Sequence, residues 1–110
     1  SALRNLATLD LRSVGLTSIG MGQLATSLQQ AKGLMGLRKL LLSDNDSVKD
    51  EGVAALATAL ATSPHLAGLE VLDLRGLCMS ADGAVKLMSA LASSAFYTNL
   101  QVSGCSRLLT

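Results

Sequence analysis

The feature that most constrains the fold is a set of leucines that recurs along the chain every 31 or 32 residues. The first set recurs twice with its internal spacing kept, and a degraded fourth set follows. Positions further along each copy recur as well, with one extra residue between positions 43 and 47. Such aligned columns indicate internal repeats, and a long repeat period takes precedence over local patterns. The four sets are Leu3, Leu6, Leu9 and Leu11; Leu34, Leu37, Leu40 and Leu42; Leu66, Leu69, Leu72 and Leu74; and Tyr97, Leu100, Ser103 and Cys105.

Each copy contains two different periodicities of apolar residues. Leu9 and Leu11 are two residues apart, which is the period of a strand that buries alternate side chains. Leu24 and Leu28 are four residues apart, which places them on one face of a helix. The sequence therefore predicts that each unit is a strand, a loop and a helix.

Capping residues and glycines recur at the start of the predicted helices. Thr17 and Ser80 occupy matching positions, where a hydroxyl can accept a hydrogen bond from a free backbone amide of the first turn. Gly20, Gly52 and Gly83 form another column. Because glycine costs roughly 1 kcal/mol inside a helix, we expect a close approach to the neighbouring unit or to the strand layer at this column.

One unit cannot bury its own leucines, so the units must stack side by side. We expect a single-domain α/β solenoid, with parallel strands about 4.8 Å apart on the concave side and helices on the convex side. Neither end carries an obvious polar cap, so we expect the chain to be part of a longer array or to have its ends covered in an assembly. The domain spans 1–110, and its units are 1–33, 34–65, 66–96 and 97–110.

The pattern LxxLxxLxLxx followed by a glycine-containing helix resembles the leucine-rich repeat family, and the unit length resembles its ribonuclease-inhibitor-like subclass. The middle copy, LRKLLLSDND followed by DEGVAALATAL, carries the resemblance best. The resemblance implies a right-handed horseshoe segment that binds proteins. The family usually has Asn or Cys at the turn after the strand. Here only Asn45 fits, and Val14, Leu77 and Leu108 hold the equivalent places.

Composition argues against several classes of function. Nine Lys and Arg balance eight Asp and Glu, and aromatic residues make up 2% of the chain. The chain therefore offers neither a basic field for nucleic-acid phosphates nor aromatic platforms for bases. No window approaches the ~18 apolar residues of a membrane span. Two cysteines are too few for a disulfide framework, so we expect a reduced, intracellular and cytoplasmic protein.

Patterns for catalysis or cofactors are weak. His65 is the only histidine, and the predicted strand separates it from Cys78, so no nucleophile–histidine pair is expected. Cys78 and Cys105 are expected to be small buried apolar residues. The run 44–46 lacks the ligand and glycine spacing of a calcium loop. The glycines of 20–25 do not follow a strand directly, as a dinucleotide site requires. We expect no catalytic residue, cofactor or metal.

The concave face is the expected binding surface. Its centre would be apolar, at Leu41 and Val71 together with Val102, and Lys39 would lie diagonally near two aspartates. Apolar anchors inside a charged rim are typical of protein interfaces, although the charged residues could equally well only neutralise one another. The residues expected to contact a protein partner are Asp10, Arg12, Lys39, Leu41, Val71, Asp73 and Arg75.

The convex side offers an alternative surface. The second predicted helix carries no charged residue after Glu51, and Ala55, Thr58, Ala59 and Thr62 would face outward. Packing against another subunit would explain this lack of charge, and an alanine-biased composition would explain it equally well.

These features predict a non-enzymatic protein-interaction module, a scaffold or a subunit of a larger complex. Two alternatives follow from the family resemblance. One is a regulator of an enzyme in trans, such as a GTPase activator or a ribonuclease-inhibitor-like blocker. The other is the sensor end of an innate immune receptor.

Overall fold

The protein belongs to the α/β class, and its structure is a computed structural model that describes residues 5–105. Strands and helices alternate along the chain, as the two periodicities of apolar residues predict. The elements are β1 (Thr8–Asp10), α1 (Ser18–Gln30), β2 (Lys39–Leu41), α2 (Asp50–Ala61), the short 3₁₀ helix η2 (Pro64–Leu66), β3 (Val71–Asp73), α3 (Ala81–Ser94) and β4 (Gln101–Ser103).

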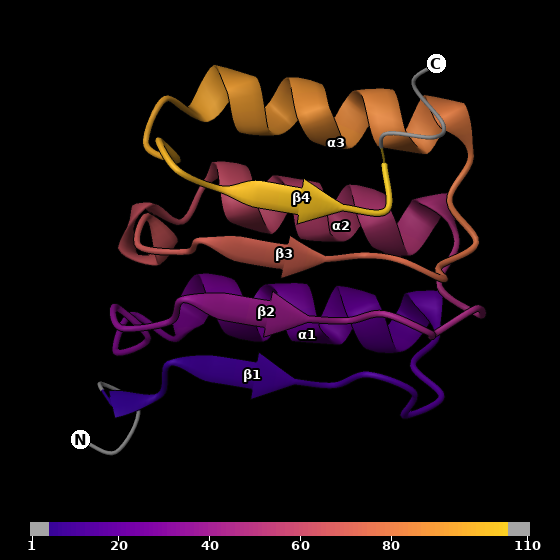
Figure 1. Ribbon diagram of the computed structural model, residues 1–110, viewed down its shortest axis with the longest axis horizontal. Helices are drawn as coiled ribbons and strands as arrows, with labels where there is room; N and C mark the ends of the chain where they lie inside the picture. Colours follow the sequence, from indigo (N-terminus) through magenta and orange to yellow (C-terminus); the bar gives the residue numbers. More distant parts are fainter. Residues whose placement is uncertain (1–4, 106–110) are drawn as a thin grey trace.

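The four strands form one parallel sheet in chain order, β1-β2-β3-β4. Figure 1 shows α1, α2 and α3 stacked in a second layer behind this sheet, also in chain order. Within residues 5–105 no helix covers the other face of the sheet, which we call the strand face (Figure 1). The predicted layer of parallel strands backed by helices is therefore confirmed.

The core lies between the two layers and consists mostly of leucine. One row of it follows the centre of the strands, where Leu9 pairs with Leu40, Leu40 with Leu72, and Leu72 with Val102. Leu40 and Leu72 are fully buried, whereas Leu9 and Val102 at the two edges are only partly buried. Because burial of apolar surface stabilises a fold by roughly 25 cal/mol per Å², the middle units contribute most of this stabilisation.

Two of the three helices begin at the predicted caps. The Thr17 hydroxyl accepts a hydrogen bond from Gly20 N at 3.2 Å, and the Ser80 hydroxyl accepts one from Gly83 N at 3.3 Å. Both predictions are confirmed. The middle helix has Lys49 at this position and no side-chain cap, but Asp50 and Glu51 in its first turn face the positive end of the helix dipole.

The glycine column marks close contacts between neighbouring units. A methyl group added at Gly52 would stand 3.0 Å from the Cα of Ser18, in the preceding helix. A methyl group at Gly83 would stand 2.8 Å from Cγ of Asp50, also in the preceding helix. The expected close approach is therefore confirmed at these two positions.

A second backbone column was not anticipated from the sequence. Ser13, Asp44 and Gly76, at equivalent places after β1, β2 and β3, all have positive φ values, of 55°, 61° and 75°. The left-handed conformation turns the chain from the strand towards the next helix. Only one of the three is glycine, so the residue types did not reveal the column.

Three expectations from the sequence are wrong. Val102 does not lie on the strand face, because it pairs with Leu72 and packs against the core; Ser103 pairs with Asp73 instead. The fourth strand is thus shifted by one residue from the repeat alignment. Ala59 is buried, at 1% exposure, rather than on the outer side of α2. Cys78 is exposed, although Cys105 is buried as expected.

Candidate functional site

The strand face brings most of the predicted contact residues into two rows. The first row crosses the strands through Thr8, Lys39, Val71 and Gln101, and the second through Asp10, Leu41, Asp73 and Ser103. Leu41 and Val71 are partly buried, so this face has apolar side chains at its centre that remain in contact with solvent. The predicted position of Leu41 between Asp10 and Asp73 is confirmed by the register.

Each aspartate on this face binds the arginine two residues later in its own strand segment. The Nε of Arg12 donates to Asp10 Oδ1 at 2.8 Å, and its Nη2 donates to Oδ2 at 2.7 Å. Arg75 binds Asp73 in the same way, at 2.8 and 2.9 Å. These two-point contacts orient the guanidinium groups and lower the freedom of both side chains.

Paired charges shift the protonation of both aspartates. The hydrogen bonds from the Arg12 side chain, aided by its backbone amide, lower the pKa of Asp10 from 3.8 to about 2. The side-chain hydrogen bonds from Arg75 likewise lower the pKa of Asp73, against the opposing effect of its burial. Both carboxyl groups are therefore anionic at neutral pH, and each stays bound to its own arginine.

The two pairs differ in what they present to solvent. The side chain of Asp73 is only 7% exposed while that of Arg75 is 67% exposed, so this pair offers mainly its cation. Asp10 and Arg12 are exposed almost equally, at 43% and 49%. The register confirms that Lys39 lies diagonally near both aspartates, because it stands two residues before Leu41, which pairs with each of them. Within residues 5–105, Lys39 nevertheless makes no ion pair. Lys39 itself is exposed.

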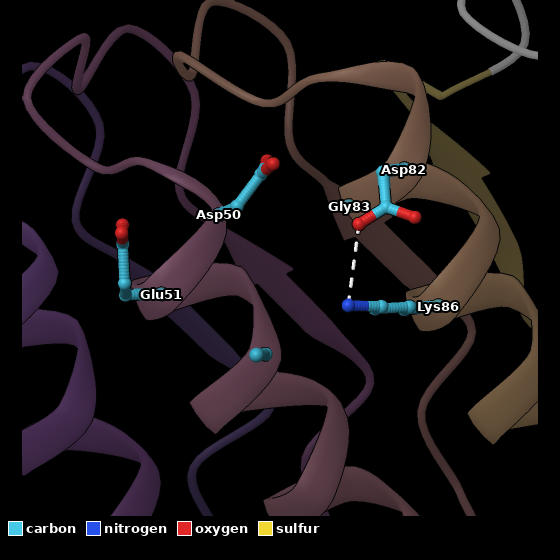
Figure 2. A pocket seen from close by; sticks show the side chains of 6 residues that line it. Asp50, Glu51, Asp82, Gly83 and Lys86 are labelled. Atoms are coloured by element: carbon cyan, nitrogen blue, oxygen red, sulfur yellow. Dashed lines mark ion pairs between the residues drawn. The ribbon is translucent and has the colours of Figure 1, made fainter.

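A second surface feature is a hollow of about 220 Å³ between the first turns of α2 and α3, lined by Asp50, Glu51, Ala54, Asp82, Gly83 and Lys86. Figure 2 shows Lys86 pointing across it, and the dashed line marks its ion pair with Asp82, at 3.2 Å. Asp50 accepts hydrogen bonds from both the backbone amide and the hydroxyl of Ser80, which lower the pKa of Asp50. Its carboxylate therefore joins two helices rather than facing a ligand.

The structure gives no chemical role to the other residues considered in the sequence. His65 Nε2 lies 2.8 Å from the backbone oxygen of Leu28, at the end of α1, so its ring fastens one unit to another. Burial raises the pKa of the Cys105 thiol, which disfavours the reactive thiolate. In the part of the chain that the structure describes, no three His, Cys, Asp or Glu residues are grouped to hold a metal ion.

Two further observations concern the whole described chain. None of its helices combines the length and the apolar character needed to cross a membrane. Comparison with models of known protein families found no match to this chain, and comparison with curated proteins found none either.

Proposed function

We propose that the protein is a non-enzymatic protein-interaction module, a scaffold or a subunit of a larger intracellular complex, and that it binds its partner through the strand face. The observation that carries this proposal is the row Asp10, Leu41, Asp73 together with the neighbouring Lys39 and Val71. An apolar centre within a rim of oriented charges is the usual composition of a protein interface.

We also propose that the fold is a leucine-rich repeat solenoid of the ribonuclease-inhibitor-like type. The aligned leucine columns, the parallel strands in chain order and the single layer of helices support it. In such a solenoid the strand face is the inner surface of a curved ribbon. A flat or convex strand face would argue against this part of the proposal.

The strand face has a rigid base, which suits a binding surface. Its side chains stand on strands whose opposite sides are fully buried leucines, as at Leu40 and Leu72. Each Asp–Arg pair is joined by two side-chain hydrogen bonds, which restrict the orientations of its arginine. A surface that is ordered before binding loses less conformational entropy when the partner docks.

Site-specific photo-crosslinking tests the proposal. A photoreactive residue at Lys39 on the strand face should capture a discrete partner in cells, whereas one at Thr58, which is exposed on α2, should not. Adding Leu41→Glu to the Lys39 probe should abolish the crosslink while the circular dichroism spectrum stays unchanged. Equal capture from both positions, or capture that survives Leu41→Glu, would contradict binding at the strand face.

A further inference from the structure

The first unit is less well covered than the units that follow it. Its apolar side chains remain partly open to solvent although their counterparts in the second unit are fully buried, and Ile19 at the start of α1 is 78% exposed. Glu51 and Asp82 hold the position of Ile19 in the next two helices. The partly open residues are Leu9, Leu11, Leu16 and Leu24; their buried counterparts are Leu40, Leu42, Val48 and Leu56.

Contacts between consecutive helices use a repeated hydrogen bond. The first residue of α1 and of α2 accepts a bond from the backbone amide of the next helix's N-cap: Ser18 Oγ from Lys49 N, and Asp50 Oδ1 from Ser80 N, both at 2.8 Å. The amide of Thr17 holds the same position before α1. No side chain in residues 5–105 accepts a hydrogen bond from it, because no helix precedes α1 in this part of the chain.

The glycine column shows the same incomplete contact. Gly52 and Gly83 each face the preceding helix so closely that a methyl group would meet Ser18 or Asp50. At Gly20 the three nearest atoms to an added methyl group belong to Leu16 and Thr17 of its own unit, the closest being Leu16 Cδ1 at 3.0 Å. Gly20 is thus the residue type that allows a close contact between helices, but it lies on a surface that no described element contacts.

From these three observations we infer that the open edge formed by β1 and α1 docks a further strand–helix unit of the same kind as those inside the molecule. The helix of that unit begins with a Ser or Asp whose side-chain oxygen accepts the hydrogen bond from Thr17 N. Its strand pairs in parallel with β1, and its first helical turn packs on Gly20. This inference does not depend on binding at the strand face.

The edge itself argues against a second copy of this chain as the occupant. A copy docked head to tail would offer β4, which no described helix follows, so it would leave α1 uncovered. The last helix of that copy, α3, begins with Ala81, which has no side-chain oxygen for the Thr17 amide. A two-fold pair would set its β1 strands antiparallel, whereas all three strand pairs inside the molecule are parallel.

The test supplies such a unit. A copy of residues 34–65 is fused directly before Leu3, so that Leu3 follows the copied His65 as Leu66 follows the original. The copied Asp50 then stands where it can accept the Thr17 amide. We expect the thermal midpoint of the extended chain to exceed that of the 110-residue chain, and hydrogen exchange at the Thr17 amide to slow by at least tenfold. Replacing the copied Asp50 with Ala should remove most of that protection.

The change in thermal midpoint caused by Gly20→Ala should have opposite signs in the 110-residue chain and in the extended chain. In the 110-residue chain it should raise the thermal midpoint by about 3 °C, because alanine favours the helix and the nearest atom belongs to the movable Leu16 side chain. In the extended chain it should lower the midpoint, because the methyl group meets the docked helix. The same sign in both chains, unchanged exchange at Thr17, or an extended chain that melts below the original would each overturn the inference.

Discussion

The side-chain nitrogen of Asn45 donates a hydrogen bond to the backbone oxygen of Leu11 at 2.9 Å, across the boundary between the first two units. The Asn45 oxygen accepts from the amides of Val14 and Leu16, at 3.2 and 2.9 Å. The side chain is 1% exposed, so these bonds are shielded from water. One amide thus supplies partners to backbone groups of the loop between β1 and α1, in the unit before its own.

Asn45→Ala should therefore destabilise the protein strongly. It leaves three backbone groups of the preceding unit without their partner, and a buried unsatisfied polar group costs about 1–3 kcal/mol. Because water can reach the exposed Val14, we expect a total loss of about 3 kcal/mol in the free energy of unfolding, measured by urea denaturation. Asn99→Ala, at an exposed position, is the control and should change it little. A loss below 1 kcal/mol would show that these hydrogen bonds are readily replaced.

The glycine column predicts opposite effects at two positions. Gly83→Ala should destabilise by about 1–3 kcal/mol, because its methyl group would displace the Asp50 carboxylate that binds Ser80. Gly22→Ala should stabilise by about 0.5–1 kcal/mol, because Gly22 lies inside α1 with open space around it. Chemical denaturation of both variants measures the two changes. Equal effects would mean that helix propensity alone, and not contact between helices, explains the column.

The sequence could predict the layers of the fold because the leucine columns report burial directly. Leu40 and Leu72 recur at the strand period and fill one core row, and this regularity also located Leu41 between the two aspartates. The register of the fourth strand was predicted wrongly by one residue because Ser103 and Cys105 replace the leucines of the earlier copies. There, Val102 takes the core position, and Gly104 has a φ of 104° just before the buried Cys105.

The side-chain partners on the candidate site were harder to predict. Strand pairing brings Lys39 beside Val71, but the pairing pattern does not say which cation an aspartate selects. Asp73 instead binds Arg75 in its own strand segment, because the guanidinium can contact both carboxylate oxygens at once and an ammonium group cannot. The burial of Asp73 also depends on its surroundings, including Ser43, which is itself buried.

Acid should destabilise the protein through its bound carboxylates. Hydrogen bonds from Arg12, Ser80 and Arg75 lower the pKa values of Asp10, Asp50 and Asp73, so the unfolded chain binds protons more readily than the folded protein does. Stability is therefore full above about pH 5 and is lost as the pH falls towards 2, where Asp10 titrates in the folded state. Urea midpoints measured across this range should fall steadily.

Asp50→Asn measures how much of this loss of stability in acid comes from the Asp50 carboxylate. The variant should be less stable than the original at pH 7 and should show a shallower loss below pH 5, because one group with a lowered pKa is gone. Asp46→Asn removes an exposed carboxylate and controls for the change in net charge. An unchanged slope in Asp50→Asn, or a protein that gains stability in acid, would contradict the assignment.

Because the chain has a single tyrosine, the titration of Tyr97 can be followed without overlap from another tyrosine. Tyr97 donates its hydroxyl proton to the backbone oxygen of Leu60 at 2.7 Å. The contact between His65 and the backbone oxygen of Leu28 is the equivalent one between the preceding units. Burial raises the pKa of Tyr97 from 10.0 to about 12. The phenolate absorbance should therefore appear near pH 12 in the folded protein and near pH 10 in urea.

The same shift has a consequence for stability in base. Between pH 10 and 12 the folded protein holds the phenol proton that the unfolded chain releases, so stability falls as the pH rises through this interval. Tyr97→Phe should cost about 1 kcal/mol at pH 7 through loss of the Leu60 hydrogen bond, and should flatten the decline above pH 10. If Tyr97 titrates near pH 10 in the folded protein, its hydroxyl is open to water and does not donate a hydrogen bond to the backbone oxygen of Leu60.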